Sequence, residues 1–583
     1  PGRTSDVRRP AAAPSLTYEE VSQLARSVDG SSEGRRLDAE GPIQQVHVGF
    51  QGPGQAVVTF MSWQPGIRSV VQYGVEGQPL SAEAQGQVST YTSQICPTNR
   101  ESLNAPAIGE QMVTDAKLAE LLDTSDVLPE DSVAYKVVEP SEAWAKLSEG
   151  CIKYSNPDAF YQAPYIHNVI LPDLKPRTRY SYRPVDSDRT FTFSTPPAAG
   201  ETEVGAPLRI GVWADVGTTL VSQGVMQALK RWQPEVAILV GDLSYADGWS
   251  PKWDIFGTLM EPLMATVGHL TVAGNHEIAE GRQQGVEWMY RYPVPYRASG
   301  SESPLWYSYE MGLVHILCIV GCYAPTGADS AQYKFVEEDL ARVNRTKTPW
   351  LVVQFHVPWY NSNRQHYEEG YKHRQDMEAL FYSYGVDIVF NGHVHSYERS
   401  YPVNNYMPDA CGIMHIVIGD AGNYEGPALP WKDPQPGWSA FRESSFGAGV
   451  LTVHNDTHAD FEWRRVACVT PTKTTVYNEL HYEWVDKDAA TCNTTGDNSA
   501  QKLEPVDSVT LVRDTVACPS RTAGGGSGLP TAFPVPKSAG GFSPITPRRR
   551  LDPELAEGRP PRQPAGVPPP AGATSEYRRP PPS

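Results

Sequence analysis

Two parts of the chain carry different hydrophobic patterns, and the first predicts an antiparallel β-sandwich over residues 44–198. Short segments of alternating apolar and polar residues are separated there by turn residues at hairpin spacing. Residues 97–160 break this pattern with helix-like and loop-like sequence, so we interpret them as an insertion. Cys96 and Cys151 flank the insertion, and we expect them to form a disulfide. The strands are expected over residues 45–50, 56–60, 69–73, 166–171, 180–183 and 190–194.

The second pattern follows a linker and predicts an α/β layered domain over residues 205–515. Fully apolar segments alternate there with helical ones, which is typical of strands in a sheet covered on both faces. Residues 467–505 are interpreted as a second insertion. The strands are expected over residues 208–212, 236–240, 270–273, 314–320, 350–355, 386–390, 413–418 and 508–513.

The two ends of the chain lack both patterns. Residues 1–43 predict a flexible leader. Residues 520–583 are rich in Pro and Gly, and such a composition buries too little apolar surface to offset the entropy of ordering, so a disordered tail is predicted. The run of three arginines at 548–550 suggests an interaction motif or a processing site, but a solvated tail is the favoured interpretation.

Charge and composition exclude some classes of partner. Lys and Arg total 49 against 67 Asp and Glu, so the net charge of −18 argues against nucleic acid as a structural partner. No apolar run reaches the roughly 18–20 residues that a membrane span needs. The first residues lack an apolar signal core, so we expect any signal peptide to lie outside this sequence.

The cysteines and glycosylation motifs indicate the compartment. The eight cysteines include no Cys-x-x-Cys pair, which argues against a zinc ribbon. Asn-x-Thr acceptor sites occur at Asn344, Asn455 and Asn493. An even cysteine count together with three acceptor sites favours the secretory pathway, with a secreted, extracellular or vacuolar destination.

Five apolar strands of the α/β domain end in residues that can bind metals. The carboxyl ends of strands in such sheets converge, so these residues are expected around one point. Taken singly, an Asp after a strand is usually a turn former, and a buried His is usually a core side chain. The coincidence of five such strand ends favours a metal site. The residues in chain order are Asp215; Asp242 and Tyr245; Asn275 and His276; His356; and His393 and His395.

The mixture of ligands indicates two metal ions. Carboxylate and phenolate oxygens suit Fe(III), whereas imidazole and amide groups suit a divalent ion such as Zn, Mn or Fe. A shared carboxylate would hold two ions about 3.5–4 Å apart, where they can clamp a phosphate and acidify a coordinated water.

These blocks resemble the purple acid phosphatases, most closely their high-molecular-weight plant and fungal branch. The similarity covers residues 44–96, 161–466 and 507–513, and it implies that the sandwich is fibronectin-III-like. The matching motifs are Asp215-Val-Gly217, Gly241-Asp-Leu-Ser-Tyr245, Gly274-Asn-His-Glu277, Val353-Gln-Phe-His356 and Gly392-His-Val-His395.

The resemblance implies a role for each residue. Asp215, Tyr245 and His395 would bind Fe(III), Asp242 would bridge, and Asn275, His356 and His393 would bind the divalent ion. His276 and His366, together with Asn275, would contact the substrate, and either histidine could protonate the leaving group. The plant pattern often has two adjacent histidines where this chain has Gln365-His366, so leaving-group preference or pH optimum is expected to differ.

The resemblance implies an acid phosphatase that hydrolyses small phosphate monoesters with a metal-bound hydroxide. Phytate is a further candidate substrate, because the segment 69–74 is similar to one in phytase-type members. The alternatives are a phosphodiesterase or nucleotide-cleaving enzyme on the same site, or a binding protein with a vestigial metal site. A homodimer is an open option. Other histidines, namely His167, His315, His415, His454 and His458, are interpreted as structural.

Overall fold

The computed structural model describes most of the chain, and all described residues lie in one compact unit, Pro1–Gly526. Several predicted features lie outside the described residues: residues 1–41 of the leader, the Cys96–Cys151 disulfide, most of the insertion at 97–160, Asn493 and the tail. The leader was predicted to end at residue 43, but Ile43 is buried in the core of the N-terminal region. The described ranges are 42–94, 112–113, 160–203, 205–247, 250–278, 285–364, 366–466, 474–478, 483–487 and 505–518.

The N-terminal region is β-rich, as the alternating pattern predicts. Its two sheets enclose an apolar core that includes Val48, Phe60 and Tyr182. Alternate residues of β10 are buried, which explains the period of two in its sequence. One sheet contains β1 (Gln44–Gly52), β2 (Gln55–Ser62), β9 (Tyr165–Leu171) and β5 (Gln87–Ser89), and the other contains β3 (Val70–Val75), β4 (Ala82–Gln85), β10 (Arg179–Pro184) and β11 (Phe191–Ser194).

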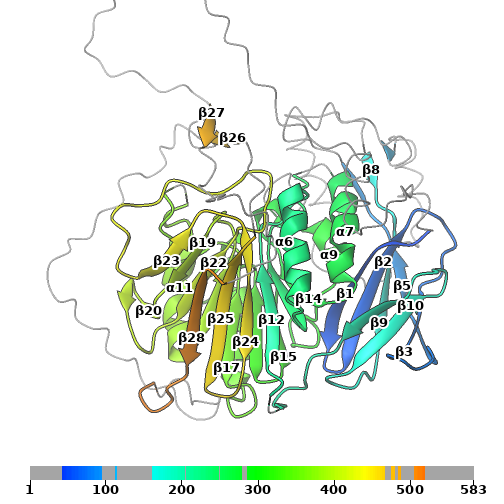
Figure 1. Ribbon diagram of the computed structural model, residues 1–583, viewed down its shortest axis with the longest axis horizontal. Helices are drawn as coiled ribbons and strands as arrows, with labels where there is room; N and C mark the ends of the chain where they lie inside the picture. Colours follow the sequence, from blue (N-terminus) through cyan, green and yellow to red (C-terminus); the bar gives the residue numbers. More distant parts are fainter. Residues whose placement is uncertain are drawn as a thin grey trace, which may run out of the picture. The chain divides into compact units, whose positions relative to one another are not determined.

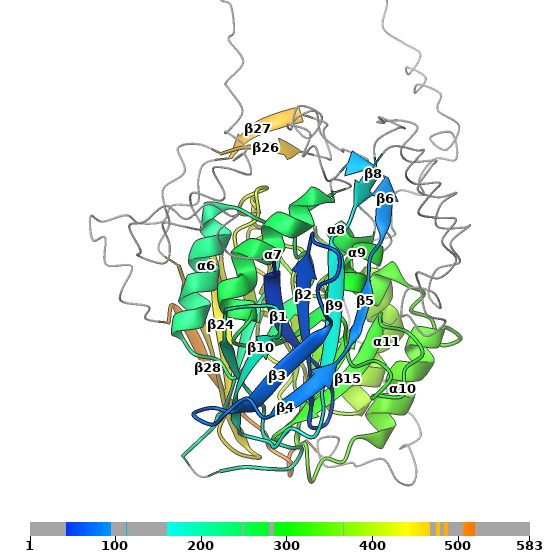
Figure 2. The ribbon, with the colours of Figure 1, turned by 90° about the vertical axis from the view of Figure 1, so that its right-hand side faces the viewer.

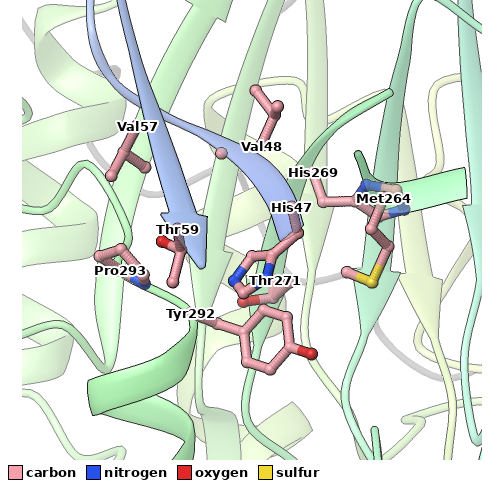
Figure 3. A pocket seen from close by; sticks show the side chains of 10 residues that line it. His47, Val48, Val57, Thr59, Met264, His269, Thr271, Tyr292 and Pro293 are labelled. Atoms are coloured by element: carbon pink, nitrogen blue, oxygen red, sulfur yellow. The ribbon is translucent and has the colours of Figure 1, made fainter. Parts of the chain in front are cut away.

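The first of these sheets continues into the next domain, a feature that the sequence does not indicate. Strand β1 pairs in parallel with β14 (Gly268–Val272) through Gly49 and His269, and Figure 1 shows the two strands as neighbours. Figure 2 shows β1, β2, β9 and β5 in order along this end of the sheet. A small cavity at the seam is lined by His47, Thr59, His269 and Tyr292 among others (Figure 3).

The second domain consists of two sheets with a shared apolar core. The ten-stranded sheet has the order β28-β25-β24-β12-β13-β14-β1-β2-β9-β5, and the seven-stranded sheet has the order β15-β16-β17-β18-β22-β19-β23. The remaining strands of the larger sheet are β12 (Leu208–Trp213), β13 (Val236–Val240), β24 (Gly447–Val453), β25 (His458–Arg465) and β28 (Asp507–Val512). The smaller contains β15 (Trp306–Met311), β16 (Val314–Ile319), β17 (Trp350–Gln354), β18 (Ile388–Asn391), β22 (Met414–Ile418), β19 (Tyr397–Ser400) and β23 (Ser439–Glu443).

Burial on both faces explains the fully apolar strands. Ile316 and Ile388 contribute to the core that the two sheets share, whereas Leu317 and Val389 pack in a separate core with α10 (Ala331–Arg342) and α11 (Tyr371–Ser383). The larger sheet is covered by α6 (Leu220–Arg231) and α7 (Pro251–Met264), and the shorter helices are α8 (Asn275–Ile278), α9 (Val286–Arg291) and the 3-10 turn η3 (Gly321–Tyr323). The α/β layered fold is therefore confirmed, but with two sheets facing each other.

Smaller elements complete the described part. Part of the insertion at 467–505 forms a hairpin of β26 (Thr474–Asn478) and β27 (Glu483–Lys487). Other short strands are β6 (Thr92–Gln94), β7 (Met112–Val113), β8 (Phe160–Gln162), β20 (Val403–Asn404) and β21 (Met407–Pro408). A disulfide joins Cys411 to Cys518, beyond the last strand. Among the described residues, no helix is both long and apolar enough to cross a membrane.

Candidate metal centre

The seven predicted ligands lie at one edge of the two sheets, where parallel strands end. Strands β12, β13 and β14 are parallel neighbours in the larger sheet, and β17 and β18 are parallel neighbours in the smaller. Their carboxyl ends therefore meet at the same side of the domain. The ligands follow these strands as Asp215 after β12, Asp242 and Tyr245 after β13, Asn275 after β14, His356 after β17, and His393 and His395 after β18.

Three of these side chains form a buried group on one side. The Tyr245 hydroxyl donates to Asp215 Oδ1 at 3.0 Å and lies 2.9 Å from His395 Nε2. His395 Nε2 is itself 3.3 Å from Asp215 Oδ1. Asp215 and Tyr245 are fully buried. We call Asp215, Tyr245 and His395 the closed half of the site.

The other four side chains form a second group. His356 Nε2 lies 2.8 Å from Asp242 Oδ2, and His393 Nδ1 lies 2.9 Å from Asn275 Oδ1. Ligand atoms of Asp242, His356 and His393 all lie within 4.8 Å of one another. We call Asn275, His356 and His393 the open half, which adjoins the closed half because His356 Nε2 is 3.8 Å from Asp215 Oδ1. Asp242 lies between the two halves, because its Oδ2 is 2.8 Å from His356 Nε2 and 3.8 Å from Nε2 of His276, whose ring packs on Tyr245.

The donor atoms of Asp242 and His356 fit a metal ion better than they fit each other. Asp242 Oδ2 and His356 Nε2 are buried and close, yet neither has a hydrogen bond of acceptable geometry among the described residues. Buried polar atoms are normally satisfied, so such a pair needs an explanation. His356 Nδ1 lies 2.7 Å from the carbonyl oxygen of Val240. That bond orients the ring and directs Nε2 toward the cluster, as in many metal-binding histidines.

The backbone is held in an uncommon conformation at the same residues. Asp215, Asp242, Tyr245 and His393 all have φ between 53° and 67°. A non-glycine residue in this left-handed region costs about 1–3 kcal/mol, and such residues cluster at functional sites. Gly274, which precedes Asn275, must be a glycine for a different reason. A Cβ at this position would collide with the Asp242 carboxylate.

Glu277 is a buried anchor for this backbone that the sequence analysis did not single out. Its carboxylate accepts hydrogen bonds from the backbone N–H groups of Asp242 and Leu243 at 2.8 Å and from that of Gly274 at 2.9 Å. The loops after β13 and β14 are therefore fixed by one side chain. Its place in the motif Gly274-Asn-His-Glu277 was the only signal in the sequence.

His276 packs over the closed half and is surrounded by carboxylates. Its ring centroid lies 3.9 Å from that of Tyr245. His276 Nδ1 contacts Asp247 Oδ1, whose other oxygen accepts from the Tyr424 hydroxyl at 2.9 Å. His276 Nε2 lies 3.9 Å from Glu425 Oε1. Asp247, Tyr424 and Glu425 were not predicted, because each resembles an ordinary loop residue in the sequence.

His366 lies beside the open half through Glu369, another residue that the sequence analysis missed. Glu369 Oε2 is 2.6 Å from His393 Nε2 and 3.1 Å from His366 Nδ1. The rings of His366 and His393 are 4.7 Å apart. Tyr323, also unpredicted, donates to Asn275 Oδ1 at 3.2 Å. Both predicted substrate-facing histidines therefore lie next to the ligand cluster.

Two buried carboxyl groups at the site, those of Asp215 and Glu277, are destabilised in their charged form. Burial raises the pKa of Asp215 to about 7, and His356 offsets this only in part. Burial alone would lower the pKa of His356, but the carboxylates of Asp242 and Asp215 raise it to about 9. Burial and the nearby Asp242 raise the pKa of Glu277 to about 7. Bound cations would stabilise these carboxylates in their charged form.

The remaining predicted residues lie away from this cluster. Asn344 and Asn455 are exposed. His167 stacks on Phe60 in the N-terminal region, and His315 lies 2.8 Å from Asp339 behind β16. His415 is buried against Tyr360, whereas His454 and His458 are exposed.

Comparison with known proteins agrees with this fold and site. Residues 43–195 match the N-terminal domain of purple acid phosphatases, and residues 208–397 match the calcineurin-like phosphoesterases. Residues 412–479 match the iron/zinc purple acid phosphatase-like protein C family. A purple acid phosphatase from yellow lupin seeds has the same fold, with a TM-score of 0.57 at 20% identity over 83% of this chain and 76% of that chain. The fold and the site thus define a metallophosphoesterase with a dinuclear centre.

Two relatives narrow the class to a family. Purple acid phosphatase 18 of Arabidopsis thaliana is 43% identical over 316 residues, which cover 54% of this chain and 71% of the relative. Fe(3+)-Zn(2+) purple acid phosphatase 12 of the same plant is 39% identical over 329 residues, covering 52% and 69%. The chain belongs to the purple acid phosphatases and is a phosphatase.

Proposed function

We propose that this phosphatase hydrolyses phosphate monoesters at acidic pH with Fe(III) in the closed half and a divalent Zn, Mn or Fe ion in the open half. The observation that carries the proposal is the division of the donors into two groups with Asp242 between them. Phenolate and carboxylate in the closed half suit Fe(III), and amide and imidazole groups in the open half suit a divalent ion.

The proposed ligands are those that lie in each half. Asp215, Tyr245 and His395 would hold Fe(III), Asn275, His356 and His393 would hold the divalent ion, and Asp242 would bridge. When bound, such a pair supplies positive charge for the phosphoryl oxygens and lowers the pKa of coordinated water, so that hydroxide becomes available as the nucleophile. The net charge of the whole chain is −18, so bound cations would supply positive charge that a phosphate needs.

His276 is the proposed proton donor to the leaving group. Burial would lower its pKa, but the Asp247 and Asp242 carboxylates raise the pKa of His276 well above its usual value. The imidazolium form would then persist through the acidic and neutral range, as a general acid requires. His366 on the open side is the second candidate, and it would hold the substrate by hydrogen bonding to a phosphoryl oxygen together with Asn275.

A visible absorption spectrum with metal analysis on the same sample tests the proposed centre. We expect a broad band from a tyrosinate bound to Fe(III), one iron and one divalent ion for each chain, and loss of the band in Tyr245→Phe. The conservative control is Tyr424→Phe, which removes a neighbouring hydroxyl that contacts Asp247 rather than a proposed ligand. A colourless protein that holds two zinc ions and is fully active would contradict the Fe(III) assignment.

The same purified protein would identify the substrate class. We expect higher kcat/KM for phosphate monoesters than for matched diesters, and phytate belongs in the monoester panel. A preference for diesters would replace this proposal by the phosphodiesterase alternative.

The secretory pathway is the proposed route for this protein. The Cys411–Cys518 disulfide is consistent with an oxidising compartment. The acceptor residues Asn344 and Asn455 are both exposed, so a glycan can be attached without disturbing the core. Enzymatic removal of N-glycans from the natural protein should raise its electrophoretic mobility, and an unchanged mobility would contradict the proposal.

A further inference from the structure

Lys252 extends from one helix back to the closed half of the site. It is the second residue of α7, and its Nζ donates a hydrogen bond of 2.7 Å to the backbone carbonyl of Tyr245, a proposed iron ligand. The residue is partly buried. A cation in the first turn of a helix is electrostatically unfavourable, because the backbone N–H groups there carry partial positive charge. The contacts that Lys252 makes outside its own helix therefore need an explanation.

The same ammonium group joins two loops that are far apart in the chain. Lys252 Nζ lies over the Tyr424 ring, 4.5 Å from its centre, and at this distance a cation is attracted to the face of an aromatic ring. Tyr424 belongs to the loop between β22 and β23, whereas Tyr245 belongs to the loop between β13 and α7. Lys252 thus holds the two loops together beside the closed half.

The loop between β13 and α7 has an uncommon backbone conformation at three positions. Asp242, Tyr245 and Asp247 all have positive φ, between 52° and 55°. Residues other than glycine keep such a conformation only where their surroundings hold them in it. The hydrogen bond from Lys252 to the Tyr245 carbonyl is one such restraint, and it acts two residues before Asp247.

The contacts of Lys252 continue to His276, the proposed proton donor. The Tyr424 hydroxyl donates to Asp247 Oδ2 at 2.9 Å, and Asp247 Oδ1 contacts His276 Nδ1. The His276 ring packs on the Tyr245 ring, with 3.9 Å between their centroids. Five residues therefore form a closed cycle of contacts around the proposed acid. In the order of these contacts they are Lys252, Tyr424, Asp247, His276 and Tyr245.

We propose that Lys252 is a positioning residue that fixes the direction of the His276 ring. His276 Nε2 lies 3.8 Å from Asp242 Oδ2, so it faces the cluster at which a phosphate ester would bind. Proton transfer requires donor and acceptor atoms about 2.6–3.2 Å apart, so a small rotation of the ring would impair it. This inference rests on the proposed phosphomonoesterase function, in which His276 protonates the leaving group.

Two substrates with different leaving groups test the role of Lys252. The alkoxide of glycerol 3-phosphate must be protonated as it leaves, whereas p-nitrophenolate is a stable anion that leaves without a proton. The measured quantity is kcat for glycerol 3-phosphate divided by kcat for p-nitrophenyl phosphate. In Lys252→Gln this ratio should fall about tenfold, because a misplaced acid loses part of the roughly 100- to 10,000-fold that general acid catalysis contributes. Lys252→Arg can still donate to the carbonyl and lie over Tyr424, so its ratio should return to within about threefold of wild type.

Three further variants complete the experiment. His276→Gln removes the acid itself and should lower the ratio by about 100-fold. Tyr424→Phe removes only the hydroxyl that holds Asp247, and it should also lower the ratio, so the test does not depend on the folding of Lys252→Gln. Lys230→Gln removes an exposed cation from α6 and should leave the ratio unchanged. The visible band and the metal content of Lys252→Gln should equal those of the wild type.

The outcomes separate the role of Lys252 from the proposed function. A wild-type ratio in Lys252→Gln or in Tyr424→Phe, beside a lowered ratio in His276→Gln, would overturn the positioning role while leaving the phosphatase intact. Loss of the visible band or of either ion in Lys252→Gln would also overturn it, because the lysine would then hold the metal centre. A wild-type ratio in His276→Gln would refute the assignment of the acid, and failure to hydrolyse either substrate would refute the proposed function. The positioning role would be lost in both of these cases.

Discussion

The closed and open halves of the site use the same kinds of residue in different surroundings. In the closed half, Asp215 and Tyr245 are fully buried and bond to each other. In the open half, the Glu369 carboxylate that contacts His393 is 45% exposed, and the side chain of His366 is 27% exposed. The side chains of His395 in the closed half and His393 in the open half are exposed to a similar extent, 10% and 13%, so the contrast lies in the more exposed residues that stand beside His393.

This difference indicates a division of labour within one cluster. Burial and a phenol in the closed half suit an ion that stays in place and is not exchanged with solvent. The open half combines an amide with two imidazoles, and the partly exposed side chains of His366 and Glu369 lie beside His393, which suits binding and release of a phosphate ester. Asp242 lies between the halves, and Glu277 fixes the backbone on which it stands.

The largest effect is expected where the two halves meet. Asp242 is the only side chain proposed to bind both ions. Asp242→Asn removes its negative charge, so kcat should fall by on the order of a thousandfold. Metal analysis should show loss of both ions or of the divalent one. The matched control is Asp329→Asn, which changes an exposed carboxylate outside the site. Full activity in Asp242→Asn would refute the proposed bridge.

A smaller effect, confined to the open half, is expected from Glu369→Gln. The amide keeps the shape of the side chain but removes the charge that faces His393 Nε2 and His366 Nδ1. Loss of such a carboxylate partner typically lowers metal affinity about 10–100-fold. Dialysis against a chelator should then remove the divalent ion while the colour of the iron site remains.

The control for that variant is Glu368→Gln, the exposed neighbour on the same loop. Glu368→Gln also removes one negative charge from this loop, but Glu368 contacts neither His366 nor His393. The divalent ion of this variant should therefore remain bound during the same dialysis. If Glu369→Gln lost iron and the divalent ion together, the two halves could not be treated as separate binding groups.

The sequence predicted that the proposed ligands lie together, because each follows a strand that is recognisable by itself. Apolar runs at β12, β13, β14, β17 and β18 placed the strand ends, and the ligand residues follow within a few positions. The N-terminal β-rich region was predicted for a similar reason, because its alternation has a period of two. The local pattern of apolar residues was sufficient to predict those elements that depend on a short segment of the chain.

The features that the sequence did not reveal depend on contacts between distant segments. The seam of β1 with β14 has a single pair of partners, Gly49 and His269, which lie far apart in the chain. Which strands belong to which sheet depends on the order in which they pair, and an apolar run does not indicate the partner of a strand. Glu369 and Asp247 become important only because folding brings a histidine to each of them.

The smallest predicted effect concerns a buried histidine away from the metal cluster. His415 on β22 is 1% exposed, packs against Trp359 and Tyr360, and has no hydrogen bond from its ring nitrogens among the described residues. Burial lowers the pKa of His415 from 6.5 to about 3. Because the unfolded chain binds this proton more readily, the stability from a neutral His415 is complete above pH 6.5 and is lost as the pH falls toward 3.

One such histidine makes the free energy of unfolding fall by about 1.4 kcal/mol for each pH unit below 6.5. His415→Leu removes the titrating group and keeps an apolar side chain, so urea unfolding between pH 4.5 and 6.5 should show a shallower pH dependence by about that amount. His458→Gln, which changes an exposed histidine on β25, should keep the wild-type slope. An unchanged slope in His415→Leu would mean that His415 can be protonated inside the folded protein, and this histidine would then make no contribution to acid destabilisation.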